Sequence, residues 1–426
     1  MTNRYSSLSD TFCVYPFFNL NSNTDGSVKL CCNIRENSHI KRPDQSDYNL
    51  GHDSVESIWN SSHMQKVRQK MLTGQQVSEC KDCYRHEELS GSSSRTTSND
   101  QYADNNIIAN NIDQFLTQGS IPAEKLASLE LRLGNTCNLA CNSCWGYSSS
   151  RVNQEKLTIL NYLPKTHQYH RLWAIERSIP ADINQWFRTD QYRNNIRSVA
   201  TNLERIYLTG GEPTMIKENR TLLKNLIEFD NTNCFVSFTT NGTTADSELI
   251  DLLKNFPNNE IQISIDGVEE QAHYIRYPLD WQEFNSNVKT ISQLDNINLV
   301  FYTVVNAYNF VSIDRIWSYL DNLAGLRPIR WYPIFLDNPD SMKTTIWPLE
   351  LRKARALELK QRLTDLKFLT NFVDRSVFDK VFEYYSSVEF DPHGLGKFLE
   401  FNAIVDKERQ TNWQKTFPEL SSLIKC

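Results

Sequence analysis

The sequence has no long apolar run and no marked excess of one charge. Hydrophobic residues make up 39% of its 426 residues, but no stretch approaches the roughly 18 apolar residues of a membrane-spanning helix, so we expect no membrane partner. The net charge of −6 argues against a protein that coats nucleic acid, although a nucleic-acid substrate is not excluded. The first residues also lack the basic and apolar segments of a signal peptide. We therefore expect a cytoplasmic protein.

The even cysteine spacing of a small secreted disulfide scaffold is absent as well. Eight of the ten cysteines fall into three groups, and only Cys234 and Cys426 stand alone. The groups are Cys13 with Cys31 and Cys32, Cys80 with Cys83, and Cys137 with Cys141 and Cys144. Clustered thiols in a reducing compartment indicate soft-metal ligation.

Composition divides the chain into four segments. Residues 1–88 are rich in cysteine, and residues 89–125 contain a polar, Ser- and Asn-rich run that we interpret as a linker. Strand and helix patterns alternate over residues 126–340, with an insert at 145–200. Residues 341–426 have helical periodicity and form a predicted helical extension.

The alternating segment predicts an α/β fold. Six short strands are expected, separated by amphipathic helices, and this alternation is typical of a parallel sheet built from βα units. Because a complete barrel of this kind has eight strands, we expect an open, partial (βα)6 barrel. The strands are Ser128–Leu133, Arg205–Thr209, Phe235–Thr239, Ile261–Ile265, Leu299–Val305 and Ile329–Tyr332, and the helices are Ile216–Phe229, Ala245–Phe256, Trp281–Leu294, Val311–Leu323 and Leu349–Leu366.

The first strand is followed directly by three cysteines. Cys137, Cys141 and Cys144 are spaced C-x3-C-x2-C, which is close enough for all three thiolates to bind one iron–sulfur cluster. Three ligands leave one iron open, as a catalytic metal site requires. The alternative is a zinc site completed by a remote cysteine or histidine, for which His167 and His170 are candidates.

This trio resembles the signature of the radical S-adenosylmethionine (SAM) superfamily. The second strand is followed by Gly210, Gly211, Glu212 and Pro213, which resemble the superfamily's GGEP segment. By this resemblance Glu212 receives the methionine ammonium of SAM. A buried carboxylate is a suitable partner for an ammonium group, and adjacent glycines allow close approach of the backbone to a ligand.

Further matches follow in the order of the family. Asn241 lies in a TNG turn after the third strand, and Ser264 and Asp266 lie in an SIDG segment after the fourth. By resemblance Arg276 pairs with the methionine carboxylate, with Ser264 near the ribose or carboxylate. The large residue that usually precedes the third cysteine is replaced by Ser143, so we expect Trp145 or backbone groups to approach the adenine.

The N-terminal cysteines resemble those of the SPASM and twitch auxiliary-cluster domains. Asp25-Gly26 predicts a hairpin turn that brings Cys13 and Cys31 together, and Cys80 and Cys83 supply a C-x2-C pair. The resemblance implies one auxiliary [4Fe–4S] cluster bound by these four cysteines, with Cys32 as an alternative to Cys31. A four-cysteine zinc site is the other interpretation.

The insert at residues 145–200 contains eight basic and four acidic residues, together with several tyrosines and tryptophans. This combination suits a lid that contacts a peptide carboxylate, a nucleotide or a nucleic-acid strand. A helical cap with a solvated basic face explains the same pattern.

The resemblance implies an oxidoreductase that cleaves SAM reductively at a [4Fe–4S] cluster. The resulting 5′-deoxyadenosyl radical abstracts hydrogen from a substrate, which we expect to be a peptide or protein side chain. An electron donor such as flavodoxin or ferredoxin is also implied. The alternatives are the same chemistry on a sugar, a nucleoside, a nucleic acid or another small molecule, and a non-catalytic, zinc-stabilised binding protein.

Overall fold

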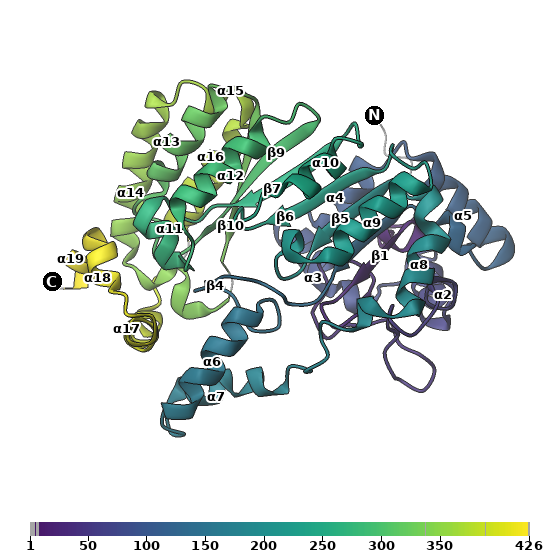
Figure 1. Ribbon diagram of the computed structural model, residues 1–426, viewed down its shortest axis with the longest axis horizontal. Coiled ribbons are helices and arrows are strands. Elements are labelled where there is room, and N and C mark those ends of the chain that lie inside the picture. Colours follow the sequence, from purple (N-terminus) through teal and green to yellow (C-terminus); the bar gives the residue numbers. More distant parts are fainter. Residues whose placement is uncertain (1–4, 6–7, 337, 388, 425–426) are drawn as a thin grey trace. The chain divides into compact units, whose positions relative to one another are not determined.

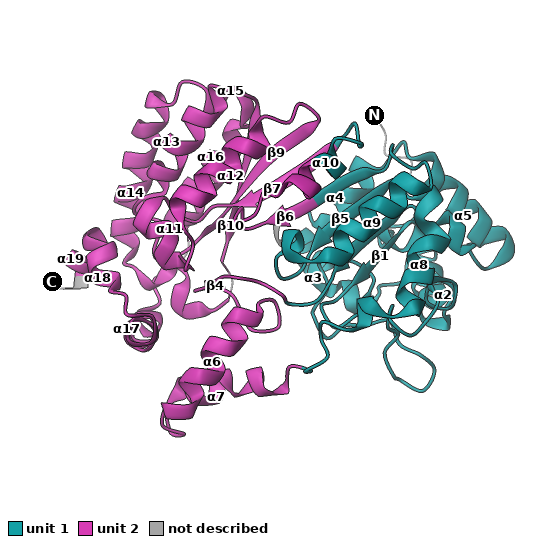
Figure 2. Ribbon diagram, viewed as in Figure 1, with its two compact units in different colours: residues 1–135, 180–237, 251–258 teal, residues 136–179, 238–250, 259–426 magenta. Residues whose placement is uncertain are grey.

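The computed structural model describes residue 5 and residues 8–336, 338–387 and 389–424. Cys426, which the sequence leaves isolated, lies outside these residues. The chain forms two compact units (Figure 2). Unit 1 consists of residues 1–135, 180–237 and 251–258, and unit 2 of residues 136–179, 238–250 and 259–426. Among the described helices, none is long and apolar enough to cross a membrane.

Unit 1 contains a mostly parallel sheet with the strand order β2-β1-β3-β5. Two of these strands, β1 and β5, are labelled in Figure 1. Its strands are β1 (Asn19–Ser22), β2 (Val28–Lys29), β3 (Ser128–Arg132) and β5 (Arg205–Thr209). β1 and β2 form the hairpin predicted at Asp25-Gly26, while β1 runs parallel to β3 and β3 runs parallel to β5. The N-terminal cysteine-rich segment therefore supplies strands to the same sheet as the first predicted barrel strand and belongs to the same compact unit.

The two faces of this sheet differ in polarity. Leu20, Leu129 and Ile206 are completely or almost completely buried on one face. Asn21 and Glu130 are paired on the other face, where the amide of Asn21 donates to the Glu130 carboxylate at 2.6 Å. Alternating side chains along a strand explain this division.

Residues 89–125 were predicted to form a polar linker, but most of this segment is helical. It forms α4 (Ser94–Gln101) and α5 (Asn106–Gln118). The serines and asparagines act as helix caps and as donors to buried backbone. Ser93 forms a capping box at the start of α4, and the amide of Asn111 donates to the carbonyl of Phe17 at 2.7 Å.

The remaining helices of unit 1 surround these strands. The α-helices are α1 (Val55–Trp59), α2 (Ser62–Leu72), α3 (Lys81–Ser90), α8 (Asp190–Val199) and α9 (Lys217–Glu228). The 3₁₀ turns are η2 (Tyr15–Phe17), η3 (Ser78–Cys80), η4 (Ala123–Lys125), η6 (Trp186–Arg188), η7 (Ala200–Asn202) and η8 (Pro213–Met215). Two elements begin in one unit and end in the other, β6 (Phe235–Thr240) and α10 (Ser247–Leu253).

Unit 2 contains parallel strands in the order β7-β9-β10, with a separate short antiparallel pair. The strands are β7 (Asn259–Ser264), β9 (Ile297–Val305) and β10 (Ile329–Phe335), and the pair is β4 (Ala140–Cys141) with β8 (Arg276–Tyr277). Apolar residues three or four positions apart bury one face of α13 (Ile313–Ala324). Its Trp317 packs edge-on against Trp331 of β10, with ring centroids 5.8 Å apart.

The other helices of unit 2 come from the insert, the βα units and the C-terminal segment. They are α6 (Ser150–Tyr162), α7 (Gln168–Trp173), α11 (Glu269–Ile275), α12 (Trp281–Ser292), α14 (Leu349–Arg362), α15 (Leu369–Phe372), α16 (Arg375–Ser387), α17 (Pro392–Arg409), α18 (Trp413–Thr416) and α19 (Pro418–Ile424), with turns η5 (Ala174–Ser178), η9 (Asp340–Met342), η10 (Thr344–Ile346) and η11 (Leu363–Asp365). The predicted α/β fold with parallel strands and a helical C-terminal segment is confirmed, and all six predicted strands are present.

Candidate functional site

The three closely spaced cysteines lie on the loop between β3 and α6, in unit 2. Two serines at the start of α6 hold this loop. The Ser149 hydroxyl donates to the Leu139 carbonyl at 2.7 Å, and the Ser150 hydroxyl accepts from the Cys137 amide at 3.2 Å. Cys141 itself belongs to β4, whose pairing with β8 places it opposite Arg276.

Nitrogen donors approach two of the sulfur atoms. The Arg276 guanidinium lies 3.9 Å from the Cys141 sulfur, and the Asn241 amide lies 3.9 Å from the Cys137 sulfur. Burial raises the pKa of Cys141, against the lowering effect of Arg276. Burial and the neighbouring Cys137 raise the pKa of Cys144 to about 11, against the effect of Lys156. Cationic groups in this position favour thiolate, the form that binds metal.

Asp266 and Arg276 form a buried ion pair next to this loop. The Arg276 Nε atom lies 2.8 Å from an Asp266 carboxylate oxygen, and Asp266 also accepts the backbone amide of Val304 at 2.7 Å. Burial raises the pKa of Asp266, and the charge of Arg276 opposes that shift. The SIDG segment therefore fixes the arginine that faces Cys141.

The predicted turn residue Asn241 is joined directly to the cysteine loop. Its amide donates to the side-chain oxygen of Asn138 at 2.9 Å, and its own oxygen accepts the hydroxyl of Thr243 at 2.6 Å. Ser264 ends β7 and is half-buried. Trp145 is 39% exposed, and its ring packs against Tyr147 at 5.2 Å.

Arg409 at the end of α17 is a residue of this site that the sequence analysis missed. It is 8% exposed and donates to the carbonyl of Ala140 at 2.7 Å and to the side chain of Asn142 at 2.6 Å. These two residues flank Cys141. Arg409 also makes two hydrogen bonds, of 2.8 and 2.7 Å, to the carboxylate of Glu155. No local sequence pattern marks it, because its partners lie more than 250 positions away.

The GGEP segment lies in unit 1, directly after β5. Gly210 has a φ of +121°, and a Cβ atom at this position would lie 3.1 Å from the carbonyl oxygen of Gly134. Glu212 is 1% exposed and caps η8 by accepting from the Thr214 amide at 3.1 Å and from its hydroxyl at 2.7 Å. Pro213 follows at the first position of this turn.

Four N-terminal thiols of unit 1 lie close enough to affect one another. Burial raises the pKa of Cys13 to about 12, with a further contribution from Cys83. Burial and Cys13 raise the pKa of Cys31 to about 12. Burial also raises the pKa of Cys80, and Cys13, Cys31 and Cys83 add to that shift.

Cys32 has a different environment. Burial and the carboxylate of Glu130 are the main causes that raise its pKa, and Cys31 is the one thiol among the named causes. Glu130 also acts on Cys31, but Cys13 and Cys83 are named causes only for Cys31 and not for Cys32.

The nine described cysteines are free thiols. Over the described ranges, no group of three or more His, Cys, Asp or Glu side chains converges tightly enough to hold one metal ion. His167, a candidate zinc ligand, instead pairs with Glu400 at 2.9 Å.

The insert is divided between the two units, and several of its aromatic side chains are buried. Tyr169 and Trp173 pack together with ring centroids 4.9 Å apart. Trp186 donates from its indole nitrogen to the carbonyl of Thr24 at 2.8 Å. These residues stabilise the fold in the positions described here.

Comparisons with known proteins identify two families in this chain. Residues 131–317 match the Radical SAM superfamily, and residues 13–84 match the SPASM family, described as an iron–sulfur cluster-binding domain. The chain therefore contains a radical SAM domain that is preceded by a SPASM domain. These domains imply a [4Fe–4S] cluster with SAM and auxiliary iron–sulfur binding, which supports the predicted cofactors.

One curated relative is the sporulation killing factor maturation protein SkfB of Bacillus subtilis (strain 168). It is 28% identical over 190 residues, which are 44% of this chain and 38% of SkfB. The chain thus matches about four-tenths of the length of this relative.

Among solved structures, SuiB of Streptococcus suis bound to SAM matches with a TM-score of 0.37 and 10% identity, over 91% of this chain and 76% of SuiB. SuiB bound to its precursor peptide SuiA matches with a TM-score of 0.37 and 13% identity, over 75% and 67%. These likenesses are too distant to support an inference about this chain.

Proposed function

We propose that this enzyme abstracts a hydrogen atom from a side chain of a peptide or protein substrate. The observation that carries the proposal is the cysteine loop, where the sulfur atoms of Cys137 and Cys141 each lie 3.9 Å from a nitrogen donor. Three thiolates in such a loop can hold a cluster and leave one iron for a ligand. When bound, the cluster and SAM supply a 5′-deoxyadenosyl radical.

The surrounding residues have separate proposed roles. Cys137, Cys141 and Cys144 bind the cluster. Arg276, oriented by its 2.8 Å ion pair with Asp266, faces a carboxylate of the ligand. Glu212 receives an ammonium group, for which its burial and its fixed hydrogen bonds to Thr214 are suited. Gly210 and Gly211 allow the backbone to approach, while Asn241, Ser264 and Trp145 are the proposed contacts for the remainder of SAM.

A peptide or protein substrate is supported by the name of the curated relative, which is a maturation protein. Cys13, Cys31, Cys80 and Cys83 are proposed to bind one auxiliary [4Fe–4S] cluster, because their thiols are mutually close. We further propose that a reducing donor such as flavodoxin or ferredoxin supplies the electron.

Anaerobic purification and a deuterium-transfer assay test this function. The full chain is expected to carry about eight irons and to absorb near ~400 nm. With a reductant and SAM it should release 5′-deoxyadenosine, and a deuterated peptide library should transfer deuterium into that product. The same assay with deuterated sugars and nucleosides is the comparison. Transfer from one of these and not from peptides would contradict the proposed substrate class, and bound zinc without iron would contradict the chemistry.

A further inference from the structure

Unit 1 contains a basic groove beside its cysteines. This cavity has a volume of about 720 Å³, within the range of ligand sites in proteins. Six of its lining residues are basic and one is acidic, in a chain whose net charge is −6. The basic residues are Arg35, Lys41, Arg42, Lys66, Lys70 and Lys81, and the acidic residue is Glu79. Residues 79 and 81 flank Cys80, so the groove adjoins the proposed auxiliary cluster.

The groove is built by segments that hydrogen bonds hold together. His63 of α2 accepts the backbone amide of Lys41 at 3.2 Å, and its other ring nitrogen lies 3.1 Å from a carboxylate oxygen of Glu79. This contact with His63 lowers the pKa of Glu79 to about 2. Glu79, the one acidic residue among the lining residues, is therefore paired with His63, which also lines the groove.

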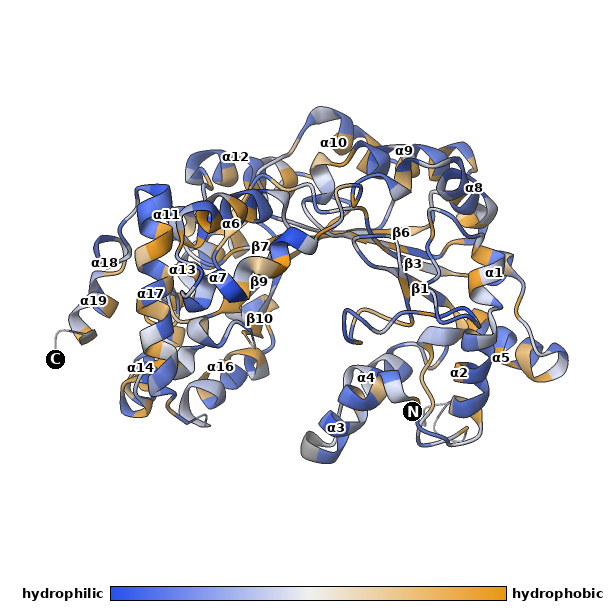
Figure 3. Ribbon diagram, turned by 90° about the horizontal axis from the view of Figure 1, so that it is seen from below, coloured by the Kyte–Doolittle hydropathy of each residue, from blue (hydrophilic) through white to orange (hydrophobic). Residues whose placement is uncertain are grey.

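Lys66 and Lys70 are among the uncompensated charges of the groove. They lie four residues apart on α2, where hydrophilic residues predominate (Figure 3), and both are exposed. No ion pair or side-chain hydrogen bond is recorded for either lysine among the described residues. Like charges at this spacing destabilise a helix slightly. Arg42, by contrast, is paired with Asp53 at 2.5 Å.

We propose that this groove binds a carboxylate-rich segment of a polypeptide. Lysine ammonium groups spread along a helix match successive carboxylates on an extended chain. Asn37, Ser38 and Gln45 also line the groove and can bond to peptide groups. None of the described residues that line it is Phe, Tyr or Trp, whereas sites for single-stranded nucleic acid use aromatic side chains to stack bases. Its volume also exceeds that of one phosphate group.

We expect the bound peptide to be an acidic region of the enzyme's substrate. This part of the inference rests on the proposed function. The binding step does not depend on that function. It can be measured without reductant or SAM, so a failure of radical chemistry and a failure of peptide binding are separate results.

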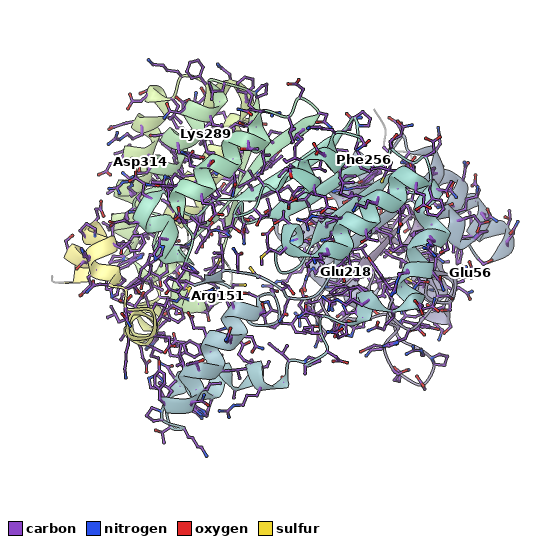
Figure 4. All side chains as sticks on the ribbon, in the orientation of Figure 1. Glu56, Arg151, Glu218, Phe256, Lys289 and Asp314 are labelled. Atoms are coloured by element: carbon purple, nitrogen blue, oxygen red, sulfur yellow. The ribbon has the colours of Figure 1, made fainter. Side chains whose placement is uncertain are left out.

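Fluorescence anisotropy of a labelled hexaglutamate peptide with the full chain tests the proposal. We expect saturable binding that weakens strongly near 1 M salt, where the screening length is about 3 Å. Hexaglutamine should not bind. The double substitution K66E/K70E should weaken hexaglutamate binding roughly tenfold or more, because two attractive charges become repulsive. K125E/K289E makes the same change of charge at exposed lysines outside the groove (Lys289 is labelled in Figure 4) and should leave binding unchanged.

Three outcomes would overturn the proposal. Equal weakening by K66E/K70E and K125E/K289E would show that net charge, and not the groove, attracts the peptide. Binding of an oligothymidylate of equal charge with higher affinity would assign the groove to nucleic acid. Displacement of the peptide by inorganic phosphate at matched ionic strength would assign it to a small anion. Circular dichroism of each variant establishes that the helices are retained.

Discussion

The two cysteine centres differ in the charges around their sulfur atoms. At the loop of unit 2, the cationic groups of Arg276 and Lys156 lower the pKa values of Cys141 and Cys144 that burial has raised. In unit 1, carboxylates add to the effect of burial at two of the thiols, whereas Arg95 opposes it at Cys13. Glu130 raises the pKa of Cys31, and Glu79 raises that of Cys80. A more negative environment disfavours addition of an electron, so we expect the N-terminal cluster to be harder to reduce.

The centres also differ in how the chain assembles them. Cys137, Cys141 and Cys144 lie within eight consecutive positions, so a single segment between β3 and α6 places all three. The N-terminal set comes from three separate segments, before β1, after β2 and around the start of α3. These three cysteines, placed by one segment, leave the fourth iron of a cluster without a protein ligand. Placement by several segments makes the second site depend on the folding of the whole unit.

The largest expected effect follows from removing one cysteine of the loop in unit 2. Cys141→Ala should abolish release of 5′-deoxyadenosine from SAM, because two thiolates cannot hold the open-iron cluster. Product is measured by liquid chromatography of anaerobic reactions. Cys234→Ala is the control, since Cys234 is buried and lies in neither centre. Cleavage retained in the first variant would remove this loop from the mechanism.

A second pair of substitutions sharpens the description of the N-terminal centre. Cys31→Ala should remove about half of the bound iron, because one of two four-iron clusters loses a ligand. Cys32→Ala should retain the iron, since that side chain lies with Glu130. Iron is counted by colorimetric assay after anaerobic purification. The reverse result would make Cys32 the ligand.

Much of the fold was predictable because its βα units have regular local patterns. β5 matches its predicted bounds, Arg205–Thr209, and α12 and α13 lie within two residues of theirs. The hairpin of β1 and β2 was predicted, but the pairing of β1 with β3 was not, because the polar side chains of β1, Asn19 and Asn21, are buried. A buried polar strand has no hydrophobic alternation to reveal it.

The candidate site was predictable only where its residues form motifs. The cysteines, Glu212 and Arg276 stand in short patterns after strands, so resemblance identified them. Arg409 has no such pattern, because a distant part of the chain brings it to the cysteine loop, and Lys156 reaches the loop from the neighbouring helix α6 without belonging to a motif. The polar helix α4 was interpreted as a linker because the residues that cap it and bond to buried backbone are polar. In the sequence alone, such residues have the same composition as a linker.

Arg409 offers a test of how firmly the loop of unit 2 is held. Arg409→Met should lower the free energy of unfolding by about 3–5 kcal/mol, because it leaves a partly buried Glu155 unpaired and frees both residues beside Cys141. Thermal unfolding of the apoprotein measures this loss, and iron content measures its effect on the cluster.

Two further variants control for this loss. Arg315→Met removes an exposed ion pair with Glu419 and should cost less than about 1 kcal/mol. Adding Glu155→Gln to Arg409→Met should restore part of the stability, because no charge is then left alone. Equal losses from Arg409→Met and Arg315→Met would show that Arg409 does not anchor the loop.

The smallest expected effect concerns the charge difference between the centres. Glu130→Gln keeps the size of a side chain that is 4% exposed and can still accept from Asn21, but it removes the negative charge that acts on Cys31. The reduction potential of the N-terminal cluster should rise by tens of millivolts, since about 59 mV corresponds to a tenfold change for a one-electron couple. Potentiometric titration followed by electron paramagnetic resonance measures both clusters in one sample. Glu88→Gln, an exposed carboxylate on α3, should leave both potentials in place. If the unit 2 cluster shifts as much as the N-terminal one, the local carboxylate is not the cause of the difference.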